Sequence, residues 1–206
     1  MSVFGMKLPD GKIDEAAPRV PDCEYARNKI DAAAAAMGAN TVFPLSVLHP
    51  TGVYSEGSKR LNMYENILTQ GYILDQEKRR GINNIVHADD VANAIVGAAS
   101  RESGGKAEEY IINGEAVIFS DWLSALERRL GVADRQRLPS FLAPLCRGPV
   151  RRLLALAGLR VPIRLPAYKT EIFEREALFS SEKALAHFGW SASRRFSDVV
   201  SRGKGS

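Results

Sequence analysis

The chain has 206 residues, of which 45% are apolar and 25% are charged. This composition is that of an ordinary globular protein and excludes a disordered or fibrous chain. The longest apolar stretches, such as residues 153–159, are far shorter than the roughly 20 residues that span a bilayer, so we expect no membrane-spanning helix. The start of the chain lacks the pattern of a secretion signal, and two cysteines, Cys23 and Cys146, do not make a disulfide framework. We therefore expect a reduced, cytoplasmic location.

The formal net charge of +4 is unevenly distributed. Residues 134–206 contain 14 Lys and Arg against 6 Asp and Glu, a net charge of +8, whereas residues 1–133 carry −4. A basic segment of this kind is either a solvated face or a surface for phosphates, nucleic acid or a membrane. Nucleic acid is disfavoured, because aromatic residues do not alternate with the arginines and no binding motif is present.

The first quarter of the chain predicts a loop, a helix and a strand. Residues 1–21 are rich in Gly, Pro and charge, which is typical of a loop. Asp22 is a suitable N-cap for a helix over residues 24–37 that ends at Gly38. The apolar run 41–48 then predicts a buried parallel strand, although Pro44 is unusual inside one. This alternation of helix and strand favours an α/β fold.

The middle of the chain continues the alternation. We expect a helix over residues 59–69, a strand over 84–87, and a helix to residue 100 capped by Asp89 or Asp90. The runs 110–113 and 116–119 flank a Gly-Glu pair and form either a hairpin or two separate strands.

The last part predicts shorter helices. Ser120 is expected to cap a helix over residues 121–130 that Gly131 closes, and Ser181 to cap one that ends at His187. The proline-containing stretch 139–166 predicts broken helices with arginines among leucines. These arginines bind substrate phosphates, lie on a membrane surface, or belong to a lid helix along which their stems extend, the interpretation we favour. They are Arg147, Arg151, Arg152, Arg160 and Arg164.

Candidate chemistry begins with Tyr25 and Lys29, which are four residues apart and therefore lie on one face of the first helix. The pair by itself also fits a surface tyrosine stacked on a lysine stem, so its context matters. That context is a series of motifs in chain order: Val-Phe-Gly at 3–5, Tyr-Ala-Arg-Asn-Lys at 25–29, Leu-His-Pro-Thr-Gly-Val-Tyr-Ser-Glu-Gly at 48–57, Ile-Val-His-Ala-Asp-Asp-Val-Ala at 85–92, Tyr-Ile-Ile-Asn-Gly at 110–114 and Phe-Gly-Trp at 188–190.

In this order and at these spacings the chain resembles the extended short-chain dehydrogenase/reductase family, of the NAD-dependent epimerase/dehydratase type. The resemblance covers nearly the whole chain. It implies an α/β fold, the C-terminal part of a Rossmann-type parallel sheet with a smaller α+β substrate domain. Residues 1–57 are then the remnant of the NAD(P)-binding domain. Residues 58–206 are mainly the substrate-binding domain, with the helix 89–100 packing back on the first.

The glycine-rich phosphate loop of this family belongs before Val3. None of the 17 glycines has the spacing of such a loop, and the position of the family's catalytic Ser or Thr would precede Met1. We therefore expect this sequence to be the C-terminal portion of such an enzyme.

The resemblance implies an NAD- or NADP-dependent oxidoreductase or epimerase/dehydratase that acts on a sugar nucleotide or another hydroxy or keto compound. Tyr25 is then the acid/base, and Lys29 lowers its pKa and binds the nicotinamide ribose, beside Pro50. The substrate-binding positions are Thr51, Gly52 and Val53. Gly52 replaces the Asn of many nucleotide-sugar enzymes, and His49 replaces an Arg.

Physical chemistry sets a condition on this role. A tyrosine has an intrinsic pKa of about 10. An ammonium group at 4 Å stabilises its anion by about 4 kcal/mol at an effective dielectric constant of 20, but by only about 1 kcal/mol in water. Lys29 therefore activates Tyr25 only where the site is covered.

The alternative is a truncated, inactive fragment or a binding module without cofactor affinity. No metal site is expected, because His87 has no partner at ligand spacing and is better explained as structural. Both cysteines are interpreted as inert. The predicted partners are a small-molecule substrate and, through the exposed strand edge at 41–48, a second copy in a homo-oligomer.

Overall fold

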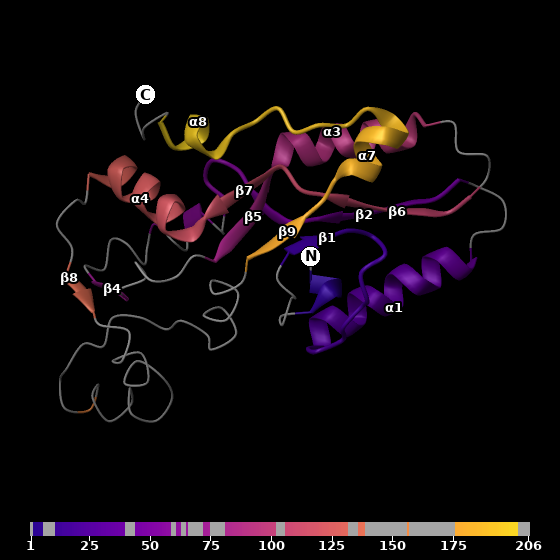
Figure 1. The fold of residues 1–206 in the computed structure, drawn as a ribbon, viewed down its shortest axis with the longest axis horizontal. Helices are drawn as coiled ribbons and strands as arrows, with labels where there is room; N and C mark the ends of the chain where they lie inside the picture. Colours follow the sequence, from indigo (N-terminus) through magenta and orange to yellow (C-terminus); the bar gives the residue numbers. More distant parts are fainter. Residues whose placement is uncertain are drawn as a thin grey trace.

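The computed structural model describes residues 2–5, 11–39, 44–58, 61–62, 65, 72–74, 81–101, 106–131, 136–138, 156 and 176–201. Within these ranges it forms four small sheets with helices around them (Figure 1). The strands pair mostly in parallel, as an α/β fold requires. No helix in the described ranges is long and apolar enough to cross a membrane.

The sheet that matters for the site consists of β2 (Ser46–Pro50) and β6 (Glu108–Ile112). They pair in parallel with Ser46 opposite Glu108 and Pro50 opposite Ile112. Helix α3 (Ala88–Ala99) contacts β2, and α1 (Glu24–Ala39) lies on the other side of the pair (Figure 1). Both faces of β2 are therefore next to a helix.

After β2 the chain enters a second sheet. In it, β5 (Ile82–His87) pairs in parallel with β3 (Gly52–Tyr54) and antiparallel with β7 (Glu115–Ile118). Helix α4 (Phe119–Leu130) and the short α8 (Phe196–Ser201) pack against it. The buried residues of this core are Tyr54, Leu61, Ile85, Phe119, Trp122, Leu123, Leu126, Phe196, Val199 and Val200.

The two remaining sheets join distant parts of the sequence. β1 (Gly11–Ile13) pairs in parallel with β9 (Ala177–Phe179), and β4 (Tyr72–Leu74) pairs with β8 (Gln136–Leu138). After β9 the chain forms α7 (Glu182–Phe188). The C-terminal segment thus closes over the first residues of the protein.

The prediction of a loop over residues 1–21 is wrong in two places. Ser2–Phe4 form a 3-10 helix, and Gly11–Ile13 form strand β1. Val3 and Phe4 are each 3% exposed, and they pack in one core with Phe179. Tertiary contacts with the C-terminal segment therefore order this stretch, and local sequence gives no sign of them.

The first predicted helix and strand are present with shifted ends. Helix α1 runs two residues further than expected, to Ala39, and the residue directly before it is Cys23, whose Sγ accepts a hydrogen bond from the Ala26 N–H at 3.4 Å. Strand β2 begins after Pro44 and Leu45 and extends to Pro50. Pro44 lacks an N–H and so stands outside the ladder. Residues 41–43 are outside the described ranges.

Two predicted caps are replaced by other residues. His87, not Asp89 or Asp90, caps α3, and its Nδ1 accepts a hydrogen bond from the Asp89 N–H at 3.2 Å. Helix α4 begins two residues earlier than expected, at Phe119 instead of after Ser120, and the buried Phe119 ring belongs to the core. Gly131 closes α4 as predicted, with φ +64°.

The runs 110–113 and 116–119 form separate strands, which decides against the hairpin. β6 pairs with β2, whereas β7 pairs with β5 in another sheet. Helix α7 follows Ser181 as predicted, but the Ser181 hydroxyl bonds to the Asn113 backbone instead of capping the helix.

The remaining sequence predictions lie mostly outside the described ranges. Leu61, Asn62 and Glu65 are helical, in agreement with a helix over 59–69. The stretch 139–166 is outside apart from Leu156, and so are Cys146 and the five arginines between 147 and 164. The boundary between two domains at residue 57 stays a prediction, although α3 does contact β2 on one side and β5 on the other.

Candidate active site

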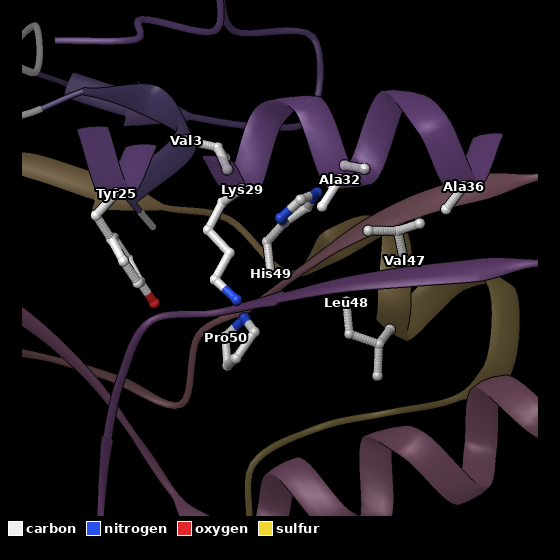
Figure 2. Close-up of a pocket in the computed structure, with 10 residues that line it drawn as sticks. Val3, Tyr25, Lys29, Ala32, Ala36, Val47, Leu48, His49 and Pro50 are labelled. Atoms are coloured by element: carbon white, nitrogen blue, oxygen red, sulfur yellow. The ribbon is translucent and has the colours of Figure 1, made fainter. Parts of the chain in front are cut away.

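A cleft of about 380 Å³ lies between α1 and β2 (Figure 2). Helix α1 contributes one face of its surface, and β2 contributes its last four residues. In α/β proteins, ligands bind at the carboxyl ends of parallel strands, so this cleft is the candidate for a functional site. The lining residues are Val3, Tyr25, Lys29, Ala32, Ala33, Ala36, Val47, Leu48, His49 and Pro50.

The sequence of α1 explains why the cleft is open. Its cleft-facing residues recur every three or four positions, from Tyr25 to Ala36, which places them on one face of a helix. Three of them are alanines, whose single methyl group leaves space that a larger side chain would fill. The helix is held in place by its contacts with the 3-10 helix and by Ile30, which packs against the adjacent core.

Tyr25 and Lys29 lie side by side and extend from α1 toward β2 (Figure 2). The Lys29 Nζ is 5.6 Å from the centre of the Tyr25 ring. Tyr25 is 62% exposed, so water screens the ammonium charge from the phenol in this arrangement. The structure brings the predicted pair together in a cleft but leaves it uncovered.

Pro50 lines the same cleft, from the end of β2. The other three predicted positions do not line it. Thr51 is 6% exposed, and its hydroxyl donates to the Asn113 Oδ1 at 3.0 Å. Gly52 and Val53 belong to β3, where Gly52 is buried and Val53 is 38% exposed. The predicted cofactor residues thus form one group, and the predicted substrate residues form another just beyond it.

His49 is a further titratable group that lines the cleft. Its ring is buried, lies edge-on to Phe4 and has its Nε2 at 3.5 Å from a carboxylate oxygen of Glu109. Glu109 is also ion-paired with Arg19. Burial lowers the pKa of His49, and the nearby Arg19 charge lowers it further, although Glu109 acts in the opposite direction. His49 is therefore neutral at pH 7.

The sequence analysis did not identify two asparagines, Asn84 and Asn113, whose side chains hydrogen-bond the backbone of strand β9 near the site. The Asn113 Nδ2 donates to the Phe179 carbonyl at 2.9 Å. The Asn84 side chain bonds β9 twice, through Nδ2 to the Ala177 carbonyl at 2.8 Å and through Oδ1 from the Phe179 N–H at 3.2 Å. For Asn84 the available signal was its position inside strand β5, because a buried amide needs partners. Asn113 follows the end of β6 and carries no such signal.

The remaining candidate residues concern a possible metal site. His87 is the cap of α3, in agreement with its predicted structural role. No group of three or more His, Cys, Asp or Glu that could hold a metal ion occurs in the described part of the chain.

Comparisons with known proteins show which fold class this chain has. No protein-family description matches the sequence, and no curated protein matches it. The solved structures that are similar over almost the whole chain include the following three. MoeE5 in complex with UDP-glucuronic acid and NAD is 15% identical with a TM-score of 0.65, and the match covers 98% of this chain and 60% of that one.

The other two structures are an epimerase and a dehydratase named for nucleotide sugars. UDP-glucose 4-epimerase from Thermotoga maritima is 14% identical with a TM-score of 0.64, and the match covers 97% of this chain and 58% of the epimerase. dTDP-glucose 4,6-dehydratase from Bacillus anthracis, in complex with NAD, is 16% identical with a TM-score of 0.62. This match covers 97% of this chain and 56% of the dehydratase.

The predicted fold class is therefore confirmed. The chain is an α/β protein with the fold of the Rossmann-type nucleotide-sugar epimerases and dehydratases, and it spans between 56% and 60% of the length of these three structures. The extended short-chain dehydrogenase/reductase resemblance seen in the motifs agrees with this fold.

Proposed function

We propose that Tyr25 and Lys29 are the acid/base pair of an NAD- or NADP-dependent enzyme of the epimerase, dehydratase or oxidoreductase type. The observation that carries the proposal is their arrangement. A phenol and an ammonium group, one helical turn apart, open into the same cleft as Pro50 at the carboxyl end of β2. Motif order and fold similarity support it independently.

The residues present fit one end of the dinucleotide. Lys29 supplies a cationic donor and Tyr25 a hydroxyl in a cleft large enough for a ribose with its nicotinamide, which Pro50 would border. None of the 17 glycines has the spacing of a phosphate-binding loop, so residues 1–206 offer no such loop to the diphosphate. The bound dinucleotide supplies hydride transfer, and nothing in the cleft favours NAD over NADP.

Tyr25 is the residue that moves the proton. In the proposed reaction its oxygen accepts the proton of a substrate hydroxyl as that carbon is oxidised, or returns it on reduction. Lys29 stabilises the phenolate, by about 4 kcal/mol at 4 Å and an effective dielectric constant of 20. Because Tyr25 is largely exposed, this stabilisation requires a cover that excludes water.

The proposed substrate is a sugar nucleotide or another hydroxy or keto compound. The similar structures support the first class, since one holds UDP-glucuronic acid and two are named for UDP-glucose and dTDP-glucose. We place substrate contacts at Thr51, Gly52 and Val53, directly after the cleft. Gly52 has no side chain to hydrogen-bond a sugar, which leaves that role to the backbone.

A second candidate is a binding module without cofactor affinity. It is favoured by the exposure of Tyr25 and by the lack of a glycine-loop spacing in this sequence. For residues 1–206 alone, both candidates predict no saturable binding of NADH or NADPH below about 1 mM, because contacts with the phosphates supply much of the affinity for a dinucleotide.

Genomic sequence and activity separate the two candidates. In-frame codons upstream of Met1 that encode a glycine-rich loop, and a Ser or Thr three residues before Val3, support the enzyme. A stop codon directly upstream supports the binding module. The product of the whole reading frame is then assayed for NAD- or NADP-dependent conversion of UDP-glucose, UDP-glucuronic acid and dTDP-glucose. Turnover that is lost in Tyr25→Phe supports the proposal, and unchanged turnover in that variant overturns it.

A further inference from the structure

The hydroxyl of Thr51 is committed to a hydrogen bond inside the protein. Thr51 directly follows the cleft-lining Pro50 and is the first of the three proposed substrate positions. Its Oγ1 donates to the Asn113 Oδ1 at 3.0 Å, and its N–H donates to the Ile112 carbonyl at 3.0 Å. Thr51 is 6% exposed, and both of its donors are taken. It therefore serves a substrate by placing the chain around it, not by donating a hydrogen bond to it.

Asn113 is itself anchored to the C-terminal segment. Its Nδ2 donates to the Phe179 carbonyl in β9 at 2.9 Å, and its N–H donates to the Ser181 hydroxyl at 2.7 Å. The Phe179 N–H in turn donates to the Asn84 Oδ1 in β5 at 3.2 Å. A side-chain amide that both donates and accepts in set directions has one orientation. Asn113 therefore offers Thr51 an acceptor that is fixed in place.

The residue after Asn113 holds the neighbouring strand. The Gly114 N–H donates to the Ile85 carbonyl at 3.0 Å. A Cβ at Gly114 would lie 3.0 Å from the same oxygen, so the close approach requires a glycine. Ile85 lies opposite Gly52 in the pair of β5 with β3. The consecutive residues Asn113 and Gly114 thus hold Thr51 directly and Gly52 through Ile85.

Gly52 makes this support necessary. Glycine loses more conformational freedom on ordering than any other residue. Because Gly52 has no side chain, the proposed contacts of this segment come from its backbone and from Val53, which is 38% exposed. Such contacts give affinity only where the backbone is already held in its bound form, since ordering it on binding costs free energy. The Thr51 hydrogen bond provides that order from the residue next to Gly52.

We propose that Thr51 and Asn113 are positioning residues of the substrate site, which hold the backbone of residues 51–53 in the form that binds the sugar nucleotide. The inference rests on the proposed function and deepens it. Tyr25 and Lys29, which carry the proposed chemistry, lie on α1 and outside this network. Loss of the Thr51 bond should therefore weaken the binding of substrate and transition state equally, which raises KM and leaves kcat unchanged.

The test measures NAD- or NADP-dependent turnover of UDP-glucose, UDP-glucuronic acid and dTDP-glucose by the product of the whole reading frame. Thr51→Val keeps the shape of the side chain and removes the donor, so KM for the converted sugar should rise about five- to tenfold. The kcat and the KM for the dinucleotide should stay within about twofold. Thr51→Ser keeps the hydroxyl and should restore most of the affinity.

A matched control and a double variant isolate the bond. Ser180→Ala removes a hydroxyl that accepts from the nearby Glu182 N–H at 3.3 Å, and should leave KM unchanged. Asn113→Ala should raise KM, and adding Thr51→Val to it should raise KM no further, because both changes remove one bond. Without substrate, amide hydrogen exchange over residues 51–54 should be about tenfold faster in Thr51→Val than in the parent.

The results that overturn this role differ from those that overturn the proposed function. An unchanged KM in Thr51→Val, an equal rise in Ser180→Ala, additive effects in the double variant or unchanged exchange over residues 51–54 would each contradict the positioning role. If Tyr25→Phe keeps full turnover while Thr51→Val still raises KM, the proposed function fails and the positioning role stands. A parent that converts none of the three sugars contradicts both.

Discussion

The Asp90 carboxylate accepts hydrogen bonds from both the backbone N–H and the hydroxyl of Ser193, at 3.1 and 2.7 Å, although 103 residues separate them in the chain. It also accepts from the Arg194 N–H at 3.0 Å, and the Asp90 carbonyl accepts from the Trp190 indole at 2.9 Å. Asp90 is 1% exposed. The first turn of α3 therefore holds the C-terminal segment around residues 190–194 in place.

The first prediction concerns this contact. Asp90→Asn should lower the free energy of unfolding by about 2 kcal/mol, because a charged acceptor of three hydrogen bonds is replaced by a group that accepts less well. Asp89→Asn is the matched control. Its carboxylate is largely exposed and pairs with Arg194 at 3.4 Å, so the loss should stay below about 0.5 kcal/mol. Urea denaturation measures both, and equal losses would contradict the role of Asp90.

The second prediction concerns pH. Burial and Arg19 lower the pKa of His49 in the folded state below its ordinary value of 6.5. A histidine that is harder to protonate when folded contributes stability that is present above pH 6.5 and is lost as the pH falls below it. His49→Gln should therefore lose less stability than the parent chain between pH 7.5 and 5.5. Urea denaturation at the two pH values gives this difference, and identical losses would show that the folded state does not disfavour the charged ring.

The third prediction compares two glycines inside helices. A Cβ at Gly97 in α3 would lie 2.8 Å from the Phe188 ring, whereas a Cβ at Gly38 in α1 has no neighbour within 4 Å. Gly97→Ala should destabilise the fold by about 1–3 kcal/mol through overpacking. Gly38→Ala should stabilise it by about 0.5–1 kcal/mol through helix propensity. Thermal unfolding reports both signs, and a stabilising Gly97→Ala would refute the close approach of α3 and α7.

The fourth prediction compares two buried tyrosines. The Tyr54 hydroxyl is buried with no hydrogen-bond partner in the described ranges, and burial raises the pKa of this tyrosine. The Tyr110 hydroxyl bonds to the His187 Nδ1 at 3.0 Å. Tyr54→Phe should be neutral or stabilising, whereas Tyr110→Phe should cost about 1 kcal/mol. Denaturation midpoints measure the pair, and a greater loss at Tyr54 would point to a partner for its hydroxyl.

Local signals in the sequence were sufficient for several elements. The alanine-rich run predicted α1, and Gly131 predicted the end of α4, because helix propensity and left-handed glycine caps act over a few residues. The Tyr25 and Lys29 spacing predicted that both side chains share a face, and the structure places both in one cleft. Each of these inferences needs only the geometry of a single helix.

The features that could not be predicted depend on distant residues. Strand β1 exists because it pairs with β9, more than 160 residues later. The role of Asp90 follows from Ser193 and Arg194, although its position before an apolar run is typical of a helix cap. The proposed substrate positions Thr51, Gly52 and Val53 directly follow the cleft-lining Pro50 in the sequence, but none of the three lines the cleft.

The central claim is that Tyr25 and Lys29 act together as an acid/base pair. Its most direct test is kcat for NAD- or NADP-dependent turnover of a UDP-sugar by the product of the whole reading frame, in three variants. Tyr25→Phe and Lys29→Met should each lower kcat by about 10²- to 10⁴-fold. Arg27→Met, which also replaces a cationic side chain of the same helix by Met but lies outside the cleft, should stay within twofold of the parent. Equal kcat values for Lys29→Met and Arg27→Met would contradict the account.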